Sequence, residues 1–422
     1  MNNGVVADVG TMPLAAWAGS LKRSALNERL MATSDRDLIS FALGFPAAEL
    51  FPTAAIAHAL QQALSSNTQT LQYGAPSARL KEHIIEIMKR RGVQSSVDEV
   101  HLTSGAQQGL SLLARLFLDA GGDVVTEQAS YPGFQQVLQM HSCRVSTVRT
   151  DLQTGFDVDE LAQLLARGVR PRLLYVMTEH HNPLGVSVSY EKRARLGELV
   201  RRYGVPVIED DAYGFLSYEG DPLPPLKVFA PEWVCYVGSF SKILAPALRT
   251  GWAILPRELA LPFSVLKFAS DLDSCSLGQR VISVLLDGWN LWSHVEDLRR
   301  EYRARRDAML SALVRLDRLG ARWTTPRGGV FVWVELPHGT DTATLLTQAV
   351  QHERVAFIPG EAFASSSAVV LAHCLRLNFS HTSVDRIHEG IRRLSVLLDR
   401  AAPSPACFDG ISREVARETS GP

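Results

Sequence analysis

Short apolar runs recur along the first part of the chain and are separated by amphipathic segments. The runs each end in glycine or in polar residues, and they occupy residues 100–103, 123–126, 172–177, 205–208 and 234–237. Runs with these lengths and boundaries are typical of strands that are buried on both faces of a sheet. In an open α/β sheet, ligands bind at the carboxyl ends of the strands, so the residues that follow each run are candidates for chemistry.

The intervening segments carry helical periodicity. Residues 78–91 place apolar side chains on one face, which is typical of an amphipathic helix. The long charged segment 291–319 predicts a solvent-flanked helix between a large and a smaller domain. Further helices are predicted at 53–64, 110–118 and 157–165, and further strands at 144–150, 330–334, 355–360 and 374–380.

Composition narrows the class of protein. With 422 residues and 46% hydrophobic content, the chain can bury a large core and form two domains. Its net charge of −1, with acidic and basic residues interspersed, predicts no binding to nucleic acid or to an anionic membrane. Five cysteines without C-x-x-C spacing predict neither a disulfide framework nor a zinc site, and they indicate a reducing cytoplasm.

The N-terminal region does not have the pattern of a secretory signal. A mildly apolar patch at 12–19 precedes Lys22 and Arg23, which is the reverse of the order in a signal peptide. No uncharged apolar run approaches the length that spans a bilayer. We therefore expect a soluble cytoplasmic protein.

A lysine lies just past the apolar run 234–237, where a reactive amine would face a ligand. This residue, Lys242, has Ser239, Ser241 and Arg249 around it in the sequence. Hydroxyls and a guanidinium are groups that bind phosphate. The spacing alone fits a solvated surface lysine equally well.

Three other features suggest a buried polar site. Residues 104–109 form a glycine-containing turn into a helix, whose free N–H groups suit a phosphate, although many such turns bind nothing. The carboxylates at 209–211 end a buried strand, and any that is enclosed needs a cation. Arg376 lies within an apolar run and needs a carboxylate, from the protein or from a substrate.

A family resemblance is carried by residues 234–252, which read V-C-Y-V-G-S-F-S-K-I-L-A-P-A-L-R-T-G-W. This segment resembles the lysine motif of fold type I enzymes dependent on pyridoxal phosphate (PLP), in the branch with 2-aminoadipate and aromatic aminotransferases. An Asn-Pro-x-Gly core also matches. The family order is reproduced by Asn182, Asp210, Tyr213, Lys242 and Arg249.

The resemblance extends from about residue 24 to residue 398 and implies the architecture. We expect an α/β fold, with a large domain around a mostly parallel seven-stranded sheet and a smaller α+β domain. The implied division is an N-terminal segment that joins the small domain, the large PLP-binding domain, the small C-terminal domain and a mobile tail. These correspond to residues 1–60, 61–297, 298–400 and 401–422.

The resemblance also implies how the PLP ring is held. Lys242 would form a Schiff base with the cofactor and, once freed, move the α-proton of the substrate. Asp210 would keep the pyridine nitrogen protonated. The ring oxygen would accept hydrogen bonds from Asn182 and Tyr213, and Tyr131 would stack on the ring. Lys242, Asp210 and Tyr213 are thus the implied catalytic residues.

The implied phosphate site uses residues from two subunits. Tyr73 would reach the phosphate of the neighbouring subunit, which implies a homodimer with shared active sites. The remaining implied phosphate ligands are Ser239, Ser241, Arg249, Gly105, Ala106 and Gln107.

Substrate binding is implied for a smaller set. Arg376 would fix the α-carboxylate of an L-amino acid, whose amino group passes to a 2-oxo acid. Gly44, Asn182 and His181 would lie beside the substrate. The identity of the amino acid stays open between 2-aminoadipate, aromatic and basic substrates, and Arg23, Arg79 and His181 are candidate selectors.

The sequence departs from its relatives at two places. They usually have an aromatic residue and a glutamine before the asparagine, whereas this chain has His180 and His181. A histidine there is either an acid or base near neutral pH or a polar substitute without a chemical role. Leu43 stands where relatives tend to have a second glycine before Gly44.

Two other functions are therefore weighed against transamination. One keeps PLP and changes the reaction to elimination, decarboxylation, oxidation or cyclisation of an amino acid. The other is a regulator with an aminotransferase-like sensor fused to a DNA-binding domain. The stretch before Ser24 is short for such a domain and has no helix-turn-helix pattern, so we expect an enzyme.

Overall fold

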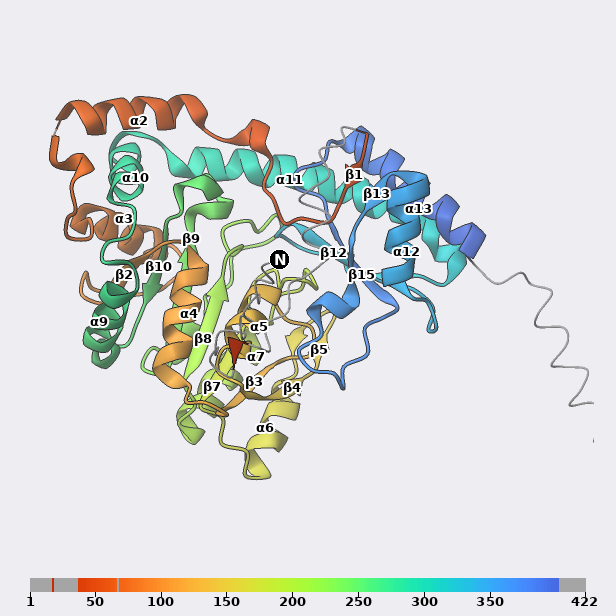
Figure 1. Ribbon diagram of the computed structural model, residues 1–422, viewed down its shortest axis with the longest axis horizontal. Coiled ribbons are helices and arrows are strands. Elements are labelled where there is room, and N and C mark those ends of the chain that lie inside the picture. The colour runs from red at the N-terminus through yellow and green to blue at the C-terminus, as the bar shows by residue number, and fades with distance from the viewer. Residues whose placement is uncertain (1–16, 19–36, 67, 402–422) are drawn as a thin grey trace, which may run out of the picture.

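The computed structural model of the protein describes residues 17–18, 37–66 and 68–401. A seven-stranded sheet of order β2-β10-β9-β8-β7-β3-β4 lies at its centre (Figure 1). β10 is antiparallel to both of its neighbours and the other pairs are parallel, so the expected mostly parallel α/β sheet is confirmed. The strands are β2 (Val100–Thr103), β3 (Asp123–Glu127), β4 (Arg144–Val148), β7 (Leu173–Val176), β8 (Val207–Asp211), β9 (Val234–Ser239) and β10 (Gly251–Ile254).

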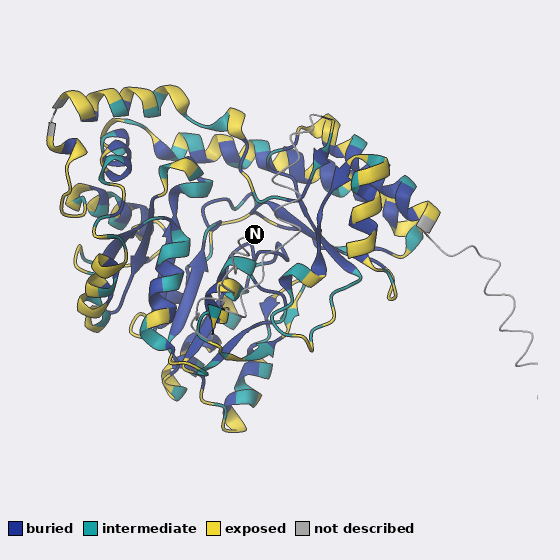
Figure 2. Cartoon of the chain, in the orientation of Figure 1, coloured by how far each residue is buried: buried dark blue, intermediate teal, exposed yellow. Residues whose placement is uncertain are grey.

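Helices cover both faces of this sheet. On one face lie α4 (Ala106–Phe117) and α5 (Pro132–Gln139), and on the other lie α6 (Val158–Ala166), α7 (Tyr190–Tyr203) and α8 (Leu226–Phe229). Burial on both faces explains why the strands read as nearly continuous apolar runs. The dark blue central strands and the yellow outer helix faces make this visible in Figure 2.

Strand alternation decides which side chains face α4 and α5. In β7, Leu174 packs toward α6 and α7, whereas Tyr175 packs toward the opposite face. In β8 the same alternation directs Glu209 toward α8, where it accepts the Leu226 N–H, and places Asp210 on the side of Tyr175. The pairing of β8 with β7 and this alternation therefore bring the Tyr175 hydroxyl and the Asp210 carboxylate together on one face of the sheet.

A second sheet is built from the C-terminal part of the chain. Its order is β11-β12-β15-β14 and all of its pairs are antiparallel. A separate parallel pair joins β1 (Ile39–Ser40) to β13 (Val355–Ala356), so residues near both chain ends lie side by side. The four strands are β11 (Arg322–Trp323), β12 (Phe331–Glu335), β14 (Ile358–Pro359) and β15 (Cys374–Asn378).

Several predicted boundaries need correction. The single strand expected over 355–360 is two short strands in different sheets, β13 and β14. The strand expected over 144–150 ends at Val148. The long helix is α11 (Leu291–Leu313), which continues as a 3-10 segment to Leu319 and packs against α13 (Val384–Ala401).

The other helices complete the layers. They are α2 (Thr53–Ser66), α3 (Ala78–Lys89), α9 (Ala260–Asp271), α10 (Ser276–Gly288) and α12 (Thr342–Gln348). None of the helices in the described ranges is long and apolar enough to cross a membrane. Apart from its first residue, the tail expected over 401–422 lies outside the described residues, as does Arg23. The proposed domain boundaries remain a prediction.

Candidate active site

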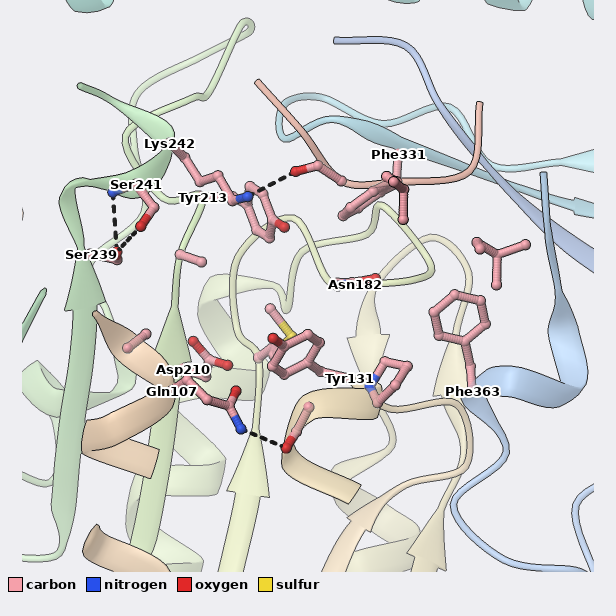
Figure 3. Close-up of a pocket in the computed structure, with 18 of the residues that line it drawn as sticks. Gln107, Tyr131, Asn182, Asp210, Tyr213, Ser239, Ser241, Lys242, Phe331 and Phe363 are labelled. Carbon is pink, nitrogen blue, oxygen red and sulfur yellow. Dashed lines mark hydrogen bonds between the residues drawn. The ribbon is translucent and has the colours of Figure 1, made fainter. Parts of the chain in front are cut away.

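A cavity of about 870 Å³ opens at the carboxyl ends of the central strands, between the two sheets (Figure 3). Ligand pockets have volumes of this order. Its lining includes residues from the central sheet, the chain near residue 44, and the smaller sheet. Twelve of the sequence-predicted site residues line it: Gly44, Ala106, Gln107, Tyr131, Asn182, Asp210, Tyr213, Ser239, Ser241, Lys242, Arg249 and Arg376.

Lys242 enters the cavity from a short 3-10 turn that directly follows β9. Its Nζ donates a hydrogen bond to the Gly44 carbonyl, with 2.8 Å between the two atoms. Burial, reinforced by the charges of Arg376 and Arg249, lowers the pKa of Lys242 to about 8. A much larger share of this amine is neutral near pH 7 than of a solvated lysine, so it is a competent nucleophile and base.

Asp210 lies in β8 with one oxygen paired and one free. Its Oδ2 accepts a hydrogen bond from the Tyr175 hydroxyl at 2.8 Å. Its Oδ1 is buried and has no hydrogen-bond partner among the residues that the structure describes. Burial raises the pKa of Asp210 to about 7, although the Tyr175 hydrogen bond acts in the opposite direction. A buried carboxylate oxygen that faces a cavity calls for a donor on a ligand.

The start of α4 and the turn after β9 form a cluster of anion-binding groups. Gly105 caps α4 with a φ of 76°, and a Cβ at this position would lie 2.5 Å from Arg249 Nη2. The Arg249 guanidinium donates to the Ser104 carbonyl at 3.0 Å. The Ser239 hydroxyl donates to Ser241 Oγ at 2.9 Å. The helix N-terminus, two hydroxyls and the guanidinium together favour a phosphate-like anion.

Arg376 projects from β15 between two aromatic rings. Its guanidinium carbon lies 4.1 Å from the centre of the Phe331 ring and 4.9 Å from that of Phe363. One nitrogen donates to Asn182 Oδ1 at 2.8 Å and another to the Ala42 carbonyl. Burial lowers the pKa of Arg376 to about 10, so the group is still protonated at neutral pH.

The charge of Arg376 has no carboxylate partner within the described ranges, and its Nε has no hydrogen-bond partner. The two flanking rings exclude water from the faces of the guanidinium and stabilise its charge. Phe363 is held in place by the central domain, since its carbonyl accepts from the Ser130 N–H at 2.9 Å and from Gln135 Nε2 at 2.7 Å. Arg376 is thus a fixed cation that lines the cavity and has no carboxylate partner among the described residues, so a carboxylate ligand can pair with it.

Comparison with known proteins assigns the family. The family model of aminotransferase class I and II matches residues 36–394. The chain belongs to the class I and II aminotransferases. It is 35% identical over 384 residues to aromatic-amino-acid aminotransferase 1 of Thermococcus litoralis, a match that covers 89% of this chain and 91% of that protein.

Two solved aminotransferase structures resemble the fold closely. Kynurenine aminotransferase of Pyrococcus horikoshii, in complex with PMP, has a TM-score of 0.87 at 33% identity and covers 94% of this chain and 99% of that chain. The α-aminoadipate aminotransferase LysN of Thermus thermophilus, complexed with N-(5'-phosphopyridoxyl)-L-leucine, has a TM-score of 0.83 at 35% identity, with coverages of 92% and 97%. The predicted fold type I architecture, aminotransferase activity and PLP cofactor are confirmed.

The cavity of this aminotransferase fits PLP. The orphaned Asp210 Oδ1 matches the protonated nitrogen of the cofactor ring. The anion-binding cluster matches the phosphate, because a side chain at Gly105 would fill the space against Arg249. Lys242 lies in the same cavity, where its amine can meet an aldehyde. Tyr131 lines the cavity as well, and burial raises the pKa of its hydroxyl, which stays protonated.

Three predicted residues do not line the cavity of this chain. Gly105 lies behind Arg249. Tyr73 has an exposed fraction of 80% and projects from a turn whose next amide, Gly74 N–H, donates to Asp273. His181 is 1% exposed and is directed at Glu127, with 2.8 Å between Nε2 and Oε2, so it does not lie where the substrate was expected.

Sequence reasoning missed several residues that shape this aminotransferase site. One is Tyr175, whose hydroxyl donates a hydrogen bond to Asp210. A tyrosine within an otherwise apolar strand could have indicated this, because a buried hydroxyl needs a hydrogen-bond partner. Phe331 and Phe363 flank Arg376 without any local signal. Arg79, proposed as a substrate selector, is engaged with Glu82 and Asp287 at the protein surface and does not line the cavity.

Proposed function

We propose that this enzyme transfers the amino group of an L-amino acid with a large apolar or aromatic side chain to a 2-oxo acid. The observation that carries the proposal is the shared cavity of Lys242, the orphaned Asp210 Oδ1 and the unpaired cation Arg376. When bound, PLP supplies an aldehyde that accepts and releases the amino group, and a ring that withdraws electrons from the substrate Cα.

In this proposal the protein holds and polarises the cofactor. Asp210 pairs with the ring nitrogen and favours its protonated form. Ser239, Ser241 and Arg249, together with the turn at 105–107, bind the phosphate. Asn182 and Tyr213 donate to the ring oxygen. Burial raises the pKa of Tyr213, so its hydroxyl keeps the proton that it donates.

Arg376 and Lys242 act on the substrate. Arg376 binds the α-carboxylate, and its two flanking rings fix the direction of that bond. Lys242 Nζ would take the proton from the substrate Cα and deliver it to the carbon that the cofactor supplies as its aldehyde carbon. The hydrogen bond to the Gly44 carbonyl places the free Nζ in the cavity, where it can meet the cofactor aldehyde.

The lining favours a neutral donor side chain. Apart from the catalytic groups, much of the wall is apolar or aromatic, with Leu43, Phe45, Pro46 and Ile358 among its residues. The cations in the described lining are Lys242, Arg249 and Arg376, and each already has a role, whereas Glu361 would repel a second carboxylate. This supports an aromatic or aliphatic donor over 2-aminoadipate, in line with the name of the Thermococcus relative.

We also propose a cytoplasmic homodimer. One face of α9 and the residue that caps its C-terminus carry four large apolar side chains with exposed fractions of 59 to 75%, namely Leu261, Val265, Phe268 and the cap Leu272. The turn that bears Tyr73 is joined to the segment just after α9 by the Gly74–Asp273 hydrogen bond. A second copy would cover this face and receive Tyr73. The four free cysteines among the described residues are consistent with a reducing cytoplasm.

A half-reaction with the purified holoenzyme tests the proposal. The visible absorption of the bound cofactor is followed while L-phenylalanine, L-leucine, L-2-aminoadipate and L-lysine are added singly, and products are identified by mass spectrometry. We expect phenylalanine and leucine to give their 2-oxo acids at least about tenfold faster than 2-aminoadipate, a difference of about 1.4 kcal/mol. Release of ammonia or carbon dioxide in place of a 2-oxo acid would overturn the transfer reaction. A preference for 2-aminoadipate would overturn only the donor class.

A further inference from the structure

A short segment ties the strand that bears Arg376 to the central sheet. This segment, the strap, comprises residues 358–365. It begins in β14, where Ile358 lies opposite Arg376 of β15, and it continues through a 3-10 turn. At its far end, the Ser365 N–H donates to the Gln128 carbonyl at 2.9 Å, just after β3. The strap therefore crosses from the neighbour of Arg376 to the carboxyl edge of the central sheet.

One side chain of α5 joins that helix to the strap. Gln135 Nε2 donates to the Phe363 carbonyl at 2.7 Å and to the Ser130 carbonyl at 3.2 Å. Both acceptors are carbonyl oxygens, so both N–H groups of the amide are used and its orientation is fixed. The Gln135 backbone N–H donates to the Tyr131 carbonyl at 3.2 Å, in the first turn of α5. Gln135 thus links the helix that begins after Tyr131 to the strap.

Phe363 is the residue of the strap that covers Arg376. Its ring, which projects from the strap toward the site in Figure 3, has its centre 4.9 Å from the guanidinium carbon. It also meets Trp333 edge to face, with 5.9 Å between the ring centres. The carbonyl and the ring belong to one residue, so a hydrogen bond at the carbonyl limits how far the ring can move over the guanidinium. The second donor to that carbonyl is the Ser130 N–H, a backbone group, so Gln135 is the side chain through which this contact can be tested.

A direct contact between Gln135 and the substrate is the competing explanation, because this half-buried residue also lines the cavity. Its amide nitrogen is committed to two carbonyls and is not free to donate to a carboxylate. Its Oε1 is an acceptor and would repel one. Any effect of Gln135 on carboxylate binding must therefore pass through the groups that it holds.

We propose that Gln135 is a positioning residue for the substrate, because by holding Phe363 against the guanidinium of Arg376 it keeps that cation directed at the α-carboxylate. The inference rests on the proposed pairing of Arg376 with the α-carboxylate. A guanidinium in a fixed orientation can meet a carboxylate with two parallel N–H···O bonds, and this geometry is lost when the group rotates. Recognition of the substrate then depends on a side chain of the helix that begins after Tyr131.

A double-substitution cycle with the full-length holoenzyme tests the inference. The half-reaction is followed by the cofactor absorbance, with the fastest donor among L-phenylalanine, L-leucine, L-2-aminoadipate and L-lysine. Gln135→Met keeps the length of the side chain and removes both N–H donors. We expect the donor concentration for half-maximal rate to rise about tenfold, or about 1.4 kcal/mol, with the limiting rate within about threefold of wild type. Added to Arg376→Gln, where the cation is absent, Gln135→Met should change kcat/KM by less than about twofold.

Gln139 provides a matched control. It lies one turn further along α5, lines the same cavity and is exposed. The effects of Gln139→Met and Arg376→Gln on kcat/KM should add, because Gln139 does not act through the cation. If Gln135→Met does not fold, Gln135→Ala takes its place, since alanine suits a helix and the site is half-buried.

Two results would overturn the inference alone. One is a wild-type half-maximal concentration in the folded Gln135 variant, and the other is an equal loss of kcat/KM with and without Arg376. If Arg376→Gln itself leaves the half-maximal concentration unchanged, the proposed pairing of Arg376 with the α-carboxylate fails, and this inference fails with it.

Discussion

The reactivity of Lys242 depends on its removal from water. Burial disfavours the ammonium form, and the charges of Arg376 and Arg249 disfavour it further, so the pKa of the amine falls to about 8. Raising the pH through 8 therefore increases the neutral fraction of this amine, whereas a solvated lysine changes near pH 10.4. We expect the rate at which the apoenzyme captures PLP to rise with pH and to be half-maximal near pH 8, as measured by stopped-flow absorbance.

The same measurement separates the causes of that shift. Arg376→Gln removes one of the two charges that lower the pKa, so the midpoint should move to higher pH. Arg392→Gln, on the outer side of α13 where the arginine binds Glu389, should leave the midpoint unchanged. A wild-type rate that still climbs above pH 10 contradicts the buried-amine account.

At the scale of elements, the residue that caps the start of α4 has a positive φ and lies at the proposed phosphate site. Gly105 combines a φ of 76° with close approach to Arg249, and Gly121 has a φ of 77° with open space around it. Gly121→Ala should lose about 1 kcal/mol of stability through backbone strain alone, and Gly105→Ala should lose more, because its added Cβ also meets Arg249; both are measured by thermal unfolding. Only Gly105→Ala should weaken PLP binding, by about tenfold, or about 1.4 kcal/mol. The affinity of Gly105→Ala for pyridoxal, which lacks the phosphate, should stay near the wild-type value. An equal loss of affinity for PLP and pyridoxal would contradict the phosphate site.

The elements also decide how much of the site could be predicted. Lys242 and Asp210 follow or end buried strands, and parallel strands bring their carboxyl ends to one edge, so local sequence sufficed to bring them together. The direction of His181 could not be predicted, because it depends on Glu127, which lies 54 positions earlier on another strand. Phe363 reaches Arg376 through contacts between the two parts of the chain, and the sequence near Phe363 carries no sign of them.

At the scale of the whole molecule, Tyr73 is exposed and does not line the cavity of its own chain, so the proposed contact with a cofactor phosphate requires an assembly. If Tyr73 completes the partner's site, each site needs Lys242 from one subunit and Tyr73 from the other. Lys242→Ala and Tyr73→Ala homodimers should each be impaired, yet one site of their heterodimer keeps both residues. In an equal mixture of exchanging two-fold dimers, about a quarter of all sites should be intact.

Mixing the two impaired enzymes should therefore restore transaminase activity toward about a quarter of the wild-type value, above the mean of the separate variants. This activity should appear at the rate at which the subunits exchange between dimers. Phe268→Glu, on the exposed face of α9, should prevent dimerisation, because a carboxylate cannot be buried there without a partner. Sedimentation should then show a monomer, and mixing should restore no activity. If Tyr73 instead served its own subunit, no mixed dimer would contain an intact site, and mixing would give only the average of the two variants.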